Sequence, residues 1–92
     1  MTRYILYSKA IKSIKENHTM FICTTIIHIL KLEKGVNVFE LLPELLEYKP
    51  EPTRTRNCWW LSDEYGKNER LRVLTELRDR YENDDNEINI TN

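Results

Sequence analysis

The stretch Asn68 to Glu82, NERLRVLTELRDRYE, decides the fold class of this chain. Apolar residues recur along it with the period of an α-helix, at Leu71, Leu74, Leu77 and Tyr81. Opposite charges four residues apart, Glu76 with Arg80 and Arg78 with Glu82, predict ion pairs along the same helix. A helix with one apolar stripe needs other elements to cover that stripe. The stretch therefore indicates a mainly α-helical protein.

A second amphipathic pattern lies near the N-terminus, from Tyr4 to Asn17. Its apolar positions are spaced as on one face of a helix, and they are Tyr4, Tyr7, Ile11 and Ile14. Residues 3–7 are aromatic or β-branched in part, which is also compatible with a short strand. We expect a helix here, with the strand as the alternative.

Met20 to Leu32 is the longest apolar stretch, and its β-branched residues favour a strand by propensity. Thirteen residues without a turn signal is long for a strand and ordinary for a buried helix, so we predict a helix. Its apolar face would consist of Ile22, Ile26, Ile29 and Leu30. Gly35 is placed to end it, since glycine readily adopts the left-handed conformation that follows many helices.

Val38 to Tyr48 predicts one or two short helical turns. Asn37 can cap the first turn, and Pro43 can begin a new one. The side chains expected to point inward are Phe39, Leu42, Leu45 and Leu46. Pro50 and Pro52 then end the element, because proline lacks the amide hydrogen that a continuing helix needs.

Length and composition predict one small helical domain over residues 1–82. The chain has 92 residues, of which 40% are hydrophobic and 32% are charged, and this suits one modest core. We expect a bundle of three to four helices with an irregular loop before the last one. Residues 83–92 are polar and acidic and predict a disordered tail. The first residues lack the pattern of an export signal, so a cytoplasmic location is expected.

Both tryptophans lie in the stretch Thr53 to Trp60, TRTRNCWW, which we call the Arg/Trp loop. Tryptophan and arginine supply stacking area and fixed hydrogen-bond donors, the chemistry typical of binding hot spots. A tryptophan here could instead fill the core, and each arginine could be ordinary surface charge. We predict that one ring stays exposed and that a partner is bound through Arg54, Arg56, Trp59, Trp60 and, from the following helix, Arg70.

No spacing in the sequence specifies a metal, a cofactor or a catalytic residue. Zinc-ligand types are present at Cys23, His18, His28 and Cys58, but their separations match no zinc finger or ribbon. Cys58 could act as a nucleophile only if folding brought a histidine close to it. We therefore expect no metal, no cofactor and no catalytic residue, and hence a protein that is not an enzyme.

The net charge of −1 conceals a segregation of charge along the chain. Lys9, Lys12 and Lys15, with Arg3, could form a basic stripe on the first helix, although a solvated helix face is the ordinary explanation. A protein that binds duplex DNA usually has an excess of basic residues over the whole domain. This chain lacks that excess, so duplex DNA is not the expected partner.

Several short motifs follow one another along the chain. They are Phe21-Ile22-Cys23 followed by Ile26, Phe39 with Leu41-Leu42-Pro43-Glu44-Leu45, Tyr48-Lys49-Pro50, Trp59-Trp60, and Arg70 with Leu74. Together they resemble a widespread class of small uncharacterised bacteriophage proteins, over about two thirds of the chain. The resemblance carries no catalytic residue. It implies a protein of the infected bacterium's cytoplasm, where small phage proteins often block a host enzyme or immune complex, or sequester a nucleotide signal.

We therefore expect a non-enzymatic phage accessory protein that inhibits a host defence factor by stoichiometric protein binding. A homodimer is also expected, because so small a domain tends to pair its exposed apolar surface. The alternative is a binder of nucleotides or single-stranded nucleic acid that sequesters a signalling ligand. That alternative predicts quenching of tryptophan fluorescence by cyclic dinucleotides or short single strands.

Overall fold

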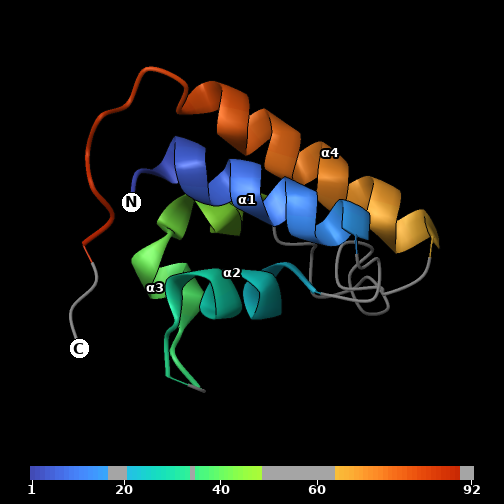
Figure 1. Ribbon diagram of the computed structural model, residues 1–92, viewed down its shortest axis with the longest axis horizontal. Coiled ribbons are helices and arrows are strands. Elements are labelled where there is room, and N and C mark those ends of the chain that lie inside the picture. The colour runs from blue at the N-terminus through green and yellow to red at the C-terminus, as the bar shows by residue number, and fades with distance from the viewer. Residues whose placement is uncertain (17–20, 34, 49–63, 90–92) are drawn as a thin grey trace.

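Helices form the framework of the computed structural model, which describes residues 1–16, 21–33, 35–48 and 64–89 (Figure 1). In chain order the helices are α1 (Arg3–Glu16), α2 (Ile22–Leu30), α3 (Val38–Leu41), the 3-10 helix η1 (Pro43–Tyr48) and α4 (Glu64–Arg80). The mainly α-helical fold predicted from the sequence is confirmed. No helix within the described residues has both the length and the apolar character needed to cross a membrane.

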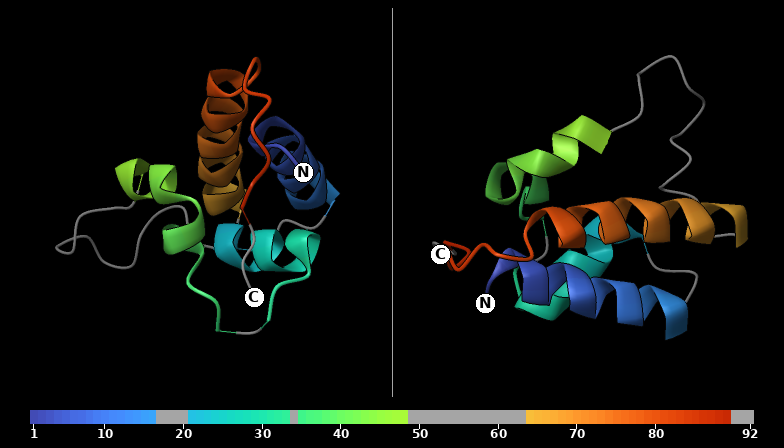
Figure 2. Two further views of the ribbon diagram at one scale, coloured as in Figure 1. Left: turned by 90° about the vertical axis from the view of Figure 1, so that its left-hand side faces the viewer. Right: turned by 90° about the horizontal axis from the view of Figure 1, so that it is seen from above.

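Helices α1 and α4 lie side by side and run in opposite directions (Figures 1 and 2). The helix predicted at the N-terminus is confirmed, and the strand alternative for residues 3–7 is wrong. The inward-facing residues of α1 are Leu6, Tyr7, Ala10, Ile11 and Ile14. Tyr4 was predicted on this face but is 37% exposed. The reason is rotation about the helix axis, because Tyr4 and the buried Leu6 lie about 200° apart.

Helix α2 packs beneath that pair and is confirmed within the predicted stretch, although it is shorter. Its buried residues are Ile22, Thr25 and Ile26, while Ile29 and Leu30 are partly buried. The helix ends at Lys31, whose φ of 55° is left-handed. The prediction that Gly35 ends this helix is wrong, because Lys31 takes the left-handed position and Gly35, with a φ of 96°, lies in the connection that follows. Lysine adopts this conformation at a cost of about 1 kcal/mol.

Helix α3 and the 3-10 helix η1 confirm the short helical turns predicted for this segment. Asn37 caps α3, because its side-chain oxygen accepts a hydrogen bond from the Phe39 backbone amide at 3.0 Å. The apolar side chains buried here are Val38, Leu42 and Leu45. Leu46 was expected to point inward but is half exposed. Neighbouring residues of a 3-10 helix lie about 120° apart, so Leu45 faces the core and Leu46 does not.

Residues 83–89, which we call the C-terminal strap, close the bundle at the end where α1 begins (red in Figure 2). Thr2 and Glu87 form an antiparallel bridge, and the Ile88 amide donates to the Met1 carbonyl at 2.9 Å. Ile88 is only 6% exposed. The sequence predicted a disordered tail from this point, but residues 83–89 are held against residues 1–2, directly before α1, and their one isoleucine reaches the core. Residues 90–92 lie outside the described residues.

Candidate functional site

Charged and aromatic side chains gather where α1, η1 and α4 meet. These residues, which we call the Arg/Tyr cluster, are Arg3 and Tyr7 of α1, Glu44, Glu47 and Tyr48 of η1, Arg80 of α4, and Tyr81 directly after it. Arg3 and Tyr7 lie four residues apart, so both project from the same side of α1. The apolar core brings the three elements together, and the cluster therefore depends on the whole fold.

Glu44 is the buried centre of the Arg/Tyr cluster, at 8% exposure. Its Oε2 accepts a hydrogen bond from Arg3 Nε at 2.7 Å and another from the Tyr7 hydroxyl at 2.5 Å. A buried carboxylate is tolerated where an opposite charge and hydrogen-bond donors replace water. Arg3 supplies the charge and Tyr7 supplies a second donor. Glu44 thereby joins α1 to η1 through a charged contact in the interior.

Burial and the Glu44 carboxylate both shift the pKa values of Tyr7 and Arg3. The pKa of Tyr7 lies far above its ordinary value of 10.0, because burial and then the hydrogen bond to Glu44 disfavour the phenolate. Burial alone would lower the pKa of Arg3, but the hydrogen bond to Glu44 and its charge outweigh burial and raise it. Tyr7 therefore stays protonated and Arg3 stays charged at physiological pH.

Alkaline solution should destabilise the protein through Tyr7. The folded pKa of Tyr7 is raised above the unfolded value of 10.0, so its stabilisation is fully present below pH 10 and is lost as the pH rises further. Above that pH the unfolded chain releases the phenolic proton while the folded chain keeps it. The unfolding free energy of the wild type should therefore decline with rising pH above pH 10. Tyr7→Phe should make this decline less steep, by about 1.4 kcal/mol per pH unit.

Urea titrations followed by circular dichroism, from about pH 9 to about pH 11, measure this slope. Tyr4→Phe is the matched control, because Tyr4 is a surface residue of the same helix. It should keep the wild-type slope. Identical slopes for the wild type and Tyr7→Phe would show that Tyr7 does not hold its proton on folding.

Arg80 forms the outer part of the Arg/Tyr cluster. It binds the Glu47 carboxylate at 2.5 Å and donates to the Tyr48 hydroxyl at 3.3 Å. Its guanidinium carbon lies 5.8 Å from the centre of the Tyr48 ring and 6.0 Å from that of Tyr81. The hydrogen bond to Glu47 raises the pKa of Arg80, which stays charged. An ion pair and two cation–π contacts thus hold one exposed arginine in a defined orientation.

Most of the residues that the sequence predicted for partner binding lie outside the described residues, namely Arg54, Arg56, Trp59 and Trp60. Arg70 is described, and the structure places it in the interior instead of at the predicted binding surface. The buried residues that share its face of α4 are Val73, Leu74 and Leu77. Spacings of three, four and seven residues put these side chains on one helical stripe, so Arg70 points toward the core.

Metal-ligating and nucleophilic residues are not assembled in the described part of the chain, where no three of its histidine, cysteine, aspartate and glutamate residues are grouped to hold a metal ion. Burial raises the pKa of the Cys23 thiol to about 11, so it is protonated and weakly nucleophilic at neutral pH. His28 is exposed and lines a shallow surface hollow of about 380 Å³ with Thr24, Ile27, Lys31 and Leu32. Cys58 and His18 lie outside the described residues.

Sequence reasoning missed the Arg/Tyr cluster as a site, although one signal for it was present. Glu44 falls between Leu42 and Leu45, which were both expected to face the core. An acidic residue at the edge of an inward-facing run predicts a buried ion pair and the need for a cationic partner. The sequence does not identify Arg3 as that partner, because the two residues are 41 positions apart.

Comparison with known proteins identified no relative of this chain. No family model matches the chain, and no curated protein and no solved structure matches it either.

Proposed function

We propose that this chain is a non-enzymatic bacteriophage accessory protein that acts in the cytoplasm of an infected bacterium. It inhibits a host defence factor by binding it in a fixed stoichiometry. The phage setting is supported by the resemblance of the short sequence motifs. The binding role is supported by the outer part of the Arg/Tyr cluster.

The single observation that carries the binding role is the orientation of Arg80 between two tyrosines. Arginine and tyrosine are enriched among the residues that dominate protein interfaces. A side chain already fixed in the free protein loses little conformational entropy on binding. Tyr48 is also the residue directly before the interval 49–63, which contains the Arg/Trp loop. The proposed contact surface contains Tyr48 and Arg80. The sequence predicts a separate contribution from the Arg/Trp loop, which lies outside the described residues.

The reactive groups of the described residues support binding over catalysis. The Glu44 carboxylate is occupied by hydrogen bonds from Arg3 and Tyr7, and Tyr7 stays protonated at neutral pH. The Cys23 thiol is protonated at neutral pH.

A homodimer is part of the proposal. Among the described residues outside α1, three large apolar side chains remain exposed, and they are Phe21, Val36 and Leu46. Small domains often pair such surface with a second copy. Sedimentation equilibrium measures the number of copies, and a monomer at all accessible concentrations would remove the dimer from the proposal.

Plaque assays test the inhibition directly. The chain is expressed in a panel of bacterial strains that each carry one defence system, and a phage sensitive to those systems is plated on them. Plaque counts should rise in at least one strain, and the purified chain should co-elute with a component of that system at a constant ratio. A panel without any rescued strain would count against the inhibition.

Paired substitutions test the contact surface. Tyr48→Ala with Arg80→Ala should weaken binding to the captured factor at least ten-fold, or about 1.4 kcal/mol, because it removes a fixed arginine and its supporting ring. Arg56→Ala with Trp60→Ala tests the Arg/Trp loop in the same way. Arg72→Ala is the control, since Arg72 is an exposed arginine of α4 that pairs with Glu69 and Glu76 of its own helix. Unchanged affinity in the Tyr48 and Arg80 variant would exclude the Arg/Tyr cluster from the interface.

A further inference from the structure

The arginines of the described chain whose side chains are exposed or partly exposed each form an ion pair with a carboxylate. The pairs are Arg3 with Glu44, Arg72 with Glu69 and Glu76, Arg78 with Asp79, and Arg80 with Glu47. The lysines of α1 differ from them. Lys9, Lys12 and Lys15 are exposed, and none forms an ion pair with another described residue. Three lysines that are unpaired among the described residues thus lie on one helix, where Glu16 is the one exposed carboxylate, and the helix keeps an excess of positive charge.

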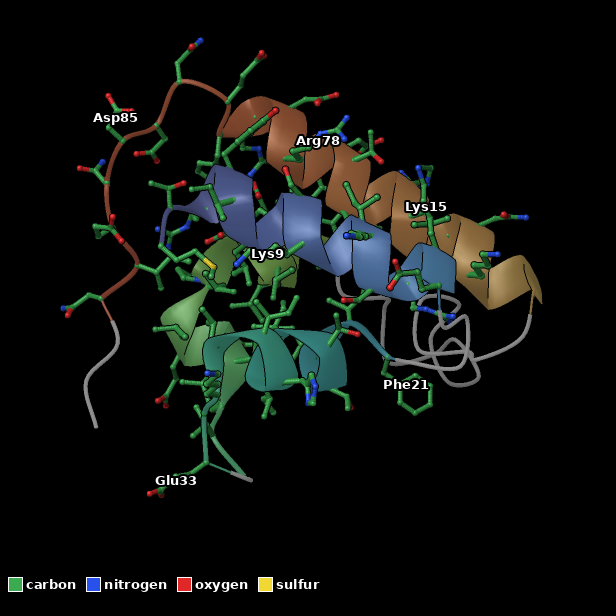
Figure 3. The ribbon with its side chains drawn as sticks, in the orientation of Figure 1. Lys9, Lys15, Phe21, Glu33, Arg78 and Asp85 are labelled. Carbon is green, nitrogen blue, oxygen red and sulfur yellow. The ribbon has the colours of Figure 1, made fainter. Side chains whose placement is uncertain are left out.

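The outer side of α1 is covered by no other element of the described chain. Helix α1 lies in front of α4 in Figure 1, and at the edge of the molecule in both views of Figure 2. Lys9 and Lys15 project from it in Figure 3. The same side carries Ile5, which is 44% exposed, and Tyr4. Ile5 and Lys12 lie about 10 Å apart along the helix axis, so apolar and charged contacts fit on one small surface.

We propose that this surface, formed by Tyr4, Ile5, Lys9, Lys12 and Lys15 and called the lysine face, binds an acidic protein surface. Carboxylates of the partner lie opposite the three lysines, and an apolar side chain of the partner packs on Ile5 and Tyr4. The lysine face belongs to α1, and the Arg/Tyr cluster is built from the inward side of α1 together with η1 and α4. The inference concerns a surface separate from that of the proposed function and does not require a phage or defence setting.

A protein partner fits the charges better than a nucleic acid does. Binding to a phosphate backbone relies on many uncompensated cations, whereas this chain has a net charge of −1 and pairs its surface arginines within the described residues. A lipid surface fits less well because an interfacial helix inserts its apolar stripe. The apolar stripe of α1 is buried in the core, and only Tyr4 and Ile5 remain outside.

A fluorescent synthetic peptide tests the proposal with the full chain. The probe is a helical peptide with three glutamates and one leucine on one face, and the matched peptide has glutamine in place of glutamate. Anisotropy titrations should show about ten-fold tighter binding of the glutamate peptide at about 50 mM salt. Raising the salt to about 300 mM should remove most of that difference.

Charge-matched variants distinguish the contribution of the lysine face to binding from the effect of net charge. Lys9→Gln, Lys12→Gln and Lys15→Gln together should lower the affinity for the glutamate peptide about ten-fold. The control combines Lys31→Gln, Arg72→Gln and Arg78→Gln, which removes the same charge from other surfaces, and it should bind within about two-fold of the wild type. Ile5→Ser should also weaken binding. Circular dichroism confirms that each variant is helical before it is titrated.

Several results would overturn the inference. Equal losses in the lysine variant and the control would mean that only net charge matters. Tighter binding of a thymidine oligonucleotide, or of phosphatidylserine vesicles, than of the glutamate peptide would assign the face to those ligands. A wild-type dimer that the lysine variant converts to a monomer would make the face a self-association surface. The peptide assay needs no host factor, so failure of the proposed function leaves its result unaffected.

Discussion

Glu44→Leu lowers the free energy of unfolding by about 3 kcal/mol, which is the largest effect we expect from a single substitution outside the apolar core. The leucine fills a similar volume but leaves the Arg3 charge and the Tyr7 hydroxyl without their shared acceptor. Removing one partner of a buried ion pair typically costs about 3 to 5 kcal/mol. The Arg3 side chain is partly exposed, so water screens its charge and the expected effect is at the low end.

Two further variants make this result specific. Glu47→Leu is the matched control, because Glu47 belongs to the same 3-10 helix and its ion pair with Arg80 is exposed. It should cost less than about 1 kcal/mol. Glu44→Leu with Arg3→Met and Tyr7→Phe should recover most of the lost stability, since an apolar replacement of a whole buried pair is often neutral. Urea unfolding measures all three, and a Glu44→Leu effect as small as that of Glu47→Leu would show that Glu44 is not buried in solution.

Ile88→Ala lowers the free energy of unfolding by about 2 kcal/mol, because it removes the side chain through which the C-terminal strap enters the core. Large-to-small substitutions of buried isoleucine typically cost about 2 to 5 kcal/mol, and the strap lies at the edge of the core, where neighbours can relax. Ile5→Ala is the control, because Ile5 is an exposed isoleucine of α1. It should change stability by less than about 0.5 kcal/mol.

Hydrogen exchange gives a second readout for the strap. The Ile88 amide donates to the Met1 carbonyl, so it should be protected in the wild type and exchange faster in Ile88→Ala. A wild-type amide that exchanges as fast as an unfolded one would mean that the strap is detached from α1.

The helices were predictable where periodicity is strong and local. Helix α4 follows from its leucine spacing, and the pattern in α1 continues for several turns. Local rules also describe Arg72, whose partners Glu69 and Glu76 lie three and four residues away on an exposed helix face. Such contacts depend only on the geometry of one helix, which the sequence specifies.

The same rule gave the wrong partners near the end of α4. Arg80 was predicted to pair with Glu76 but binds Glu47, 33 residues away, because packing brings η1 against this end of the helix. Arg78 was predicted to pair with Glu82, which lies beyond the last residue of α4, and it binds Asp79 instead.

The Arg/Tyr cluster and the strap could not be derived from the sequence for the same reason. Both consist of contacts between residues far apart in the chain, such as Arg3 with Glu44 and Met1 with Ile88. Glu44 is a single glutamate among leucines, and Ile88 is a single isoleucine in a polar segment. A single residue forms no periodic pattern from which its partner can be identified. The predicted residues of the Arg/Trp loop lie outside the described residues, and their role stays a prediction.

The attachment of the C-terminal strap to the start of α1 has a consequence during synthesis of the protein. Arg3, in the first turn of α1, binds the carboxylate of residue 44, and Thr2, directly before α1, forms a β-bridge with residue 87, so both partners are translated later than the residues they contact. Contacts between such distant positions slow folding, because a long loop must close before they form. The N-terminal turn of α1 therefore reaches its final environment only after residue 88 has left the exit tunnel, and an incomplete chain exposes apolar surface there until translation has passed that point.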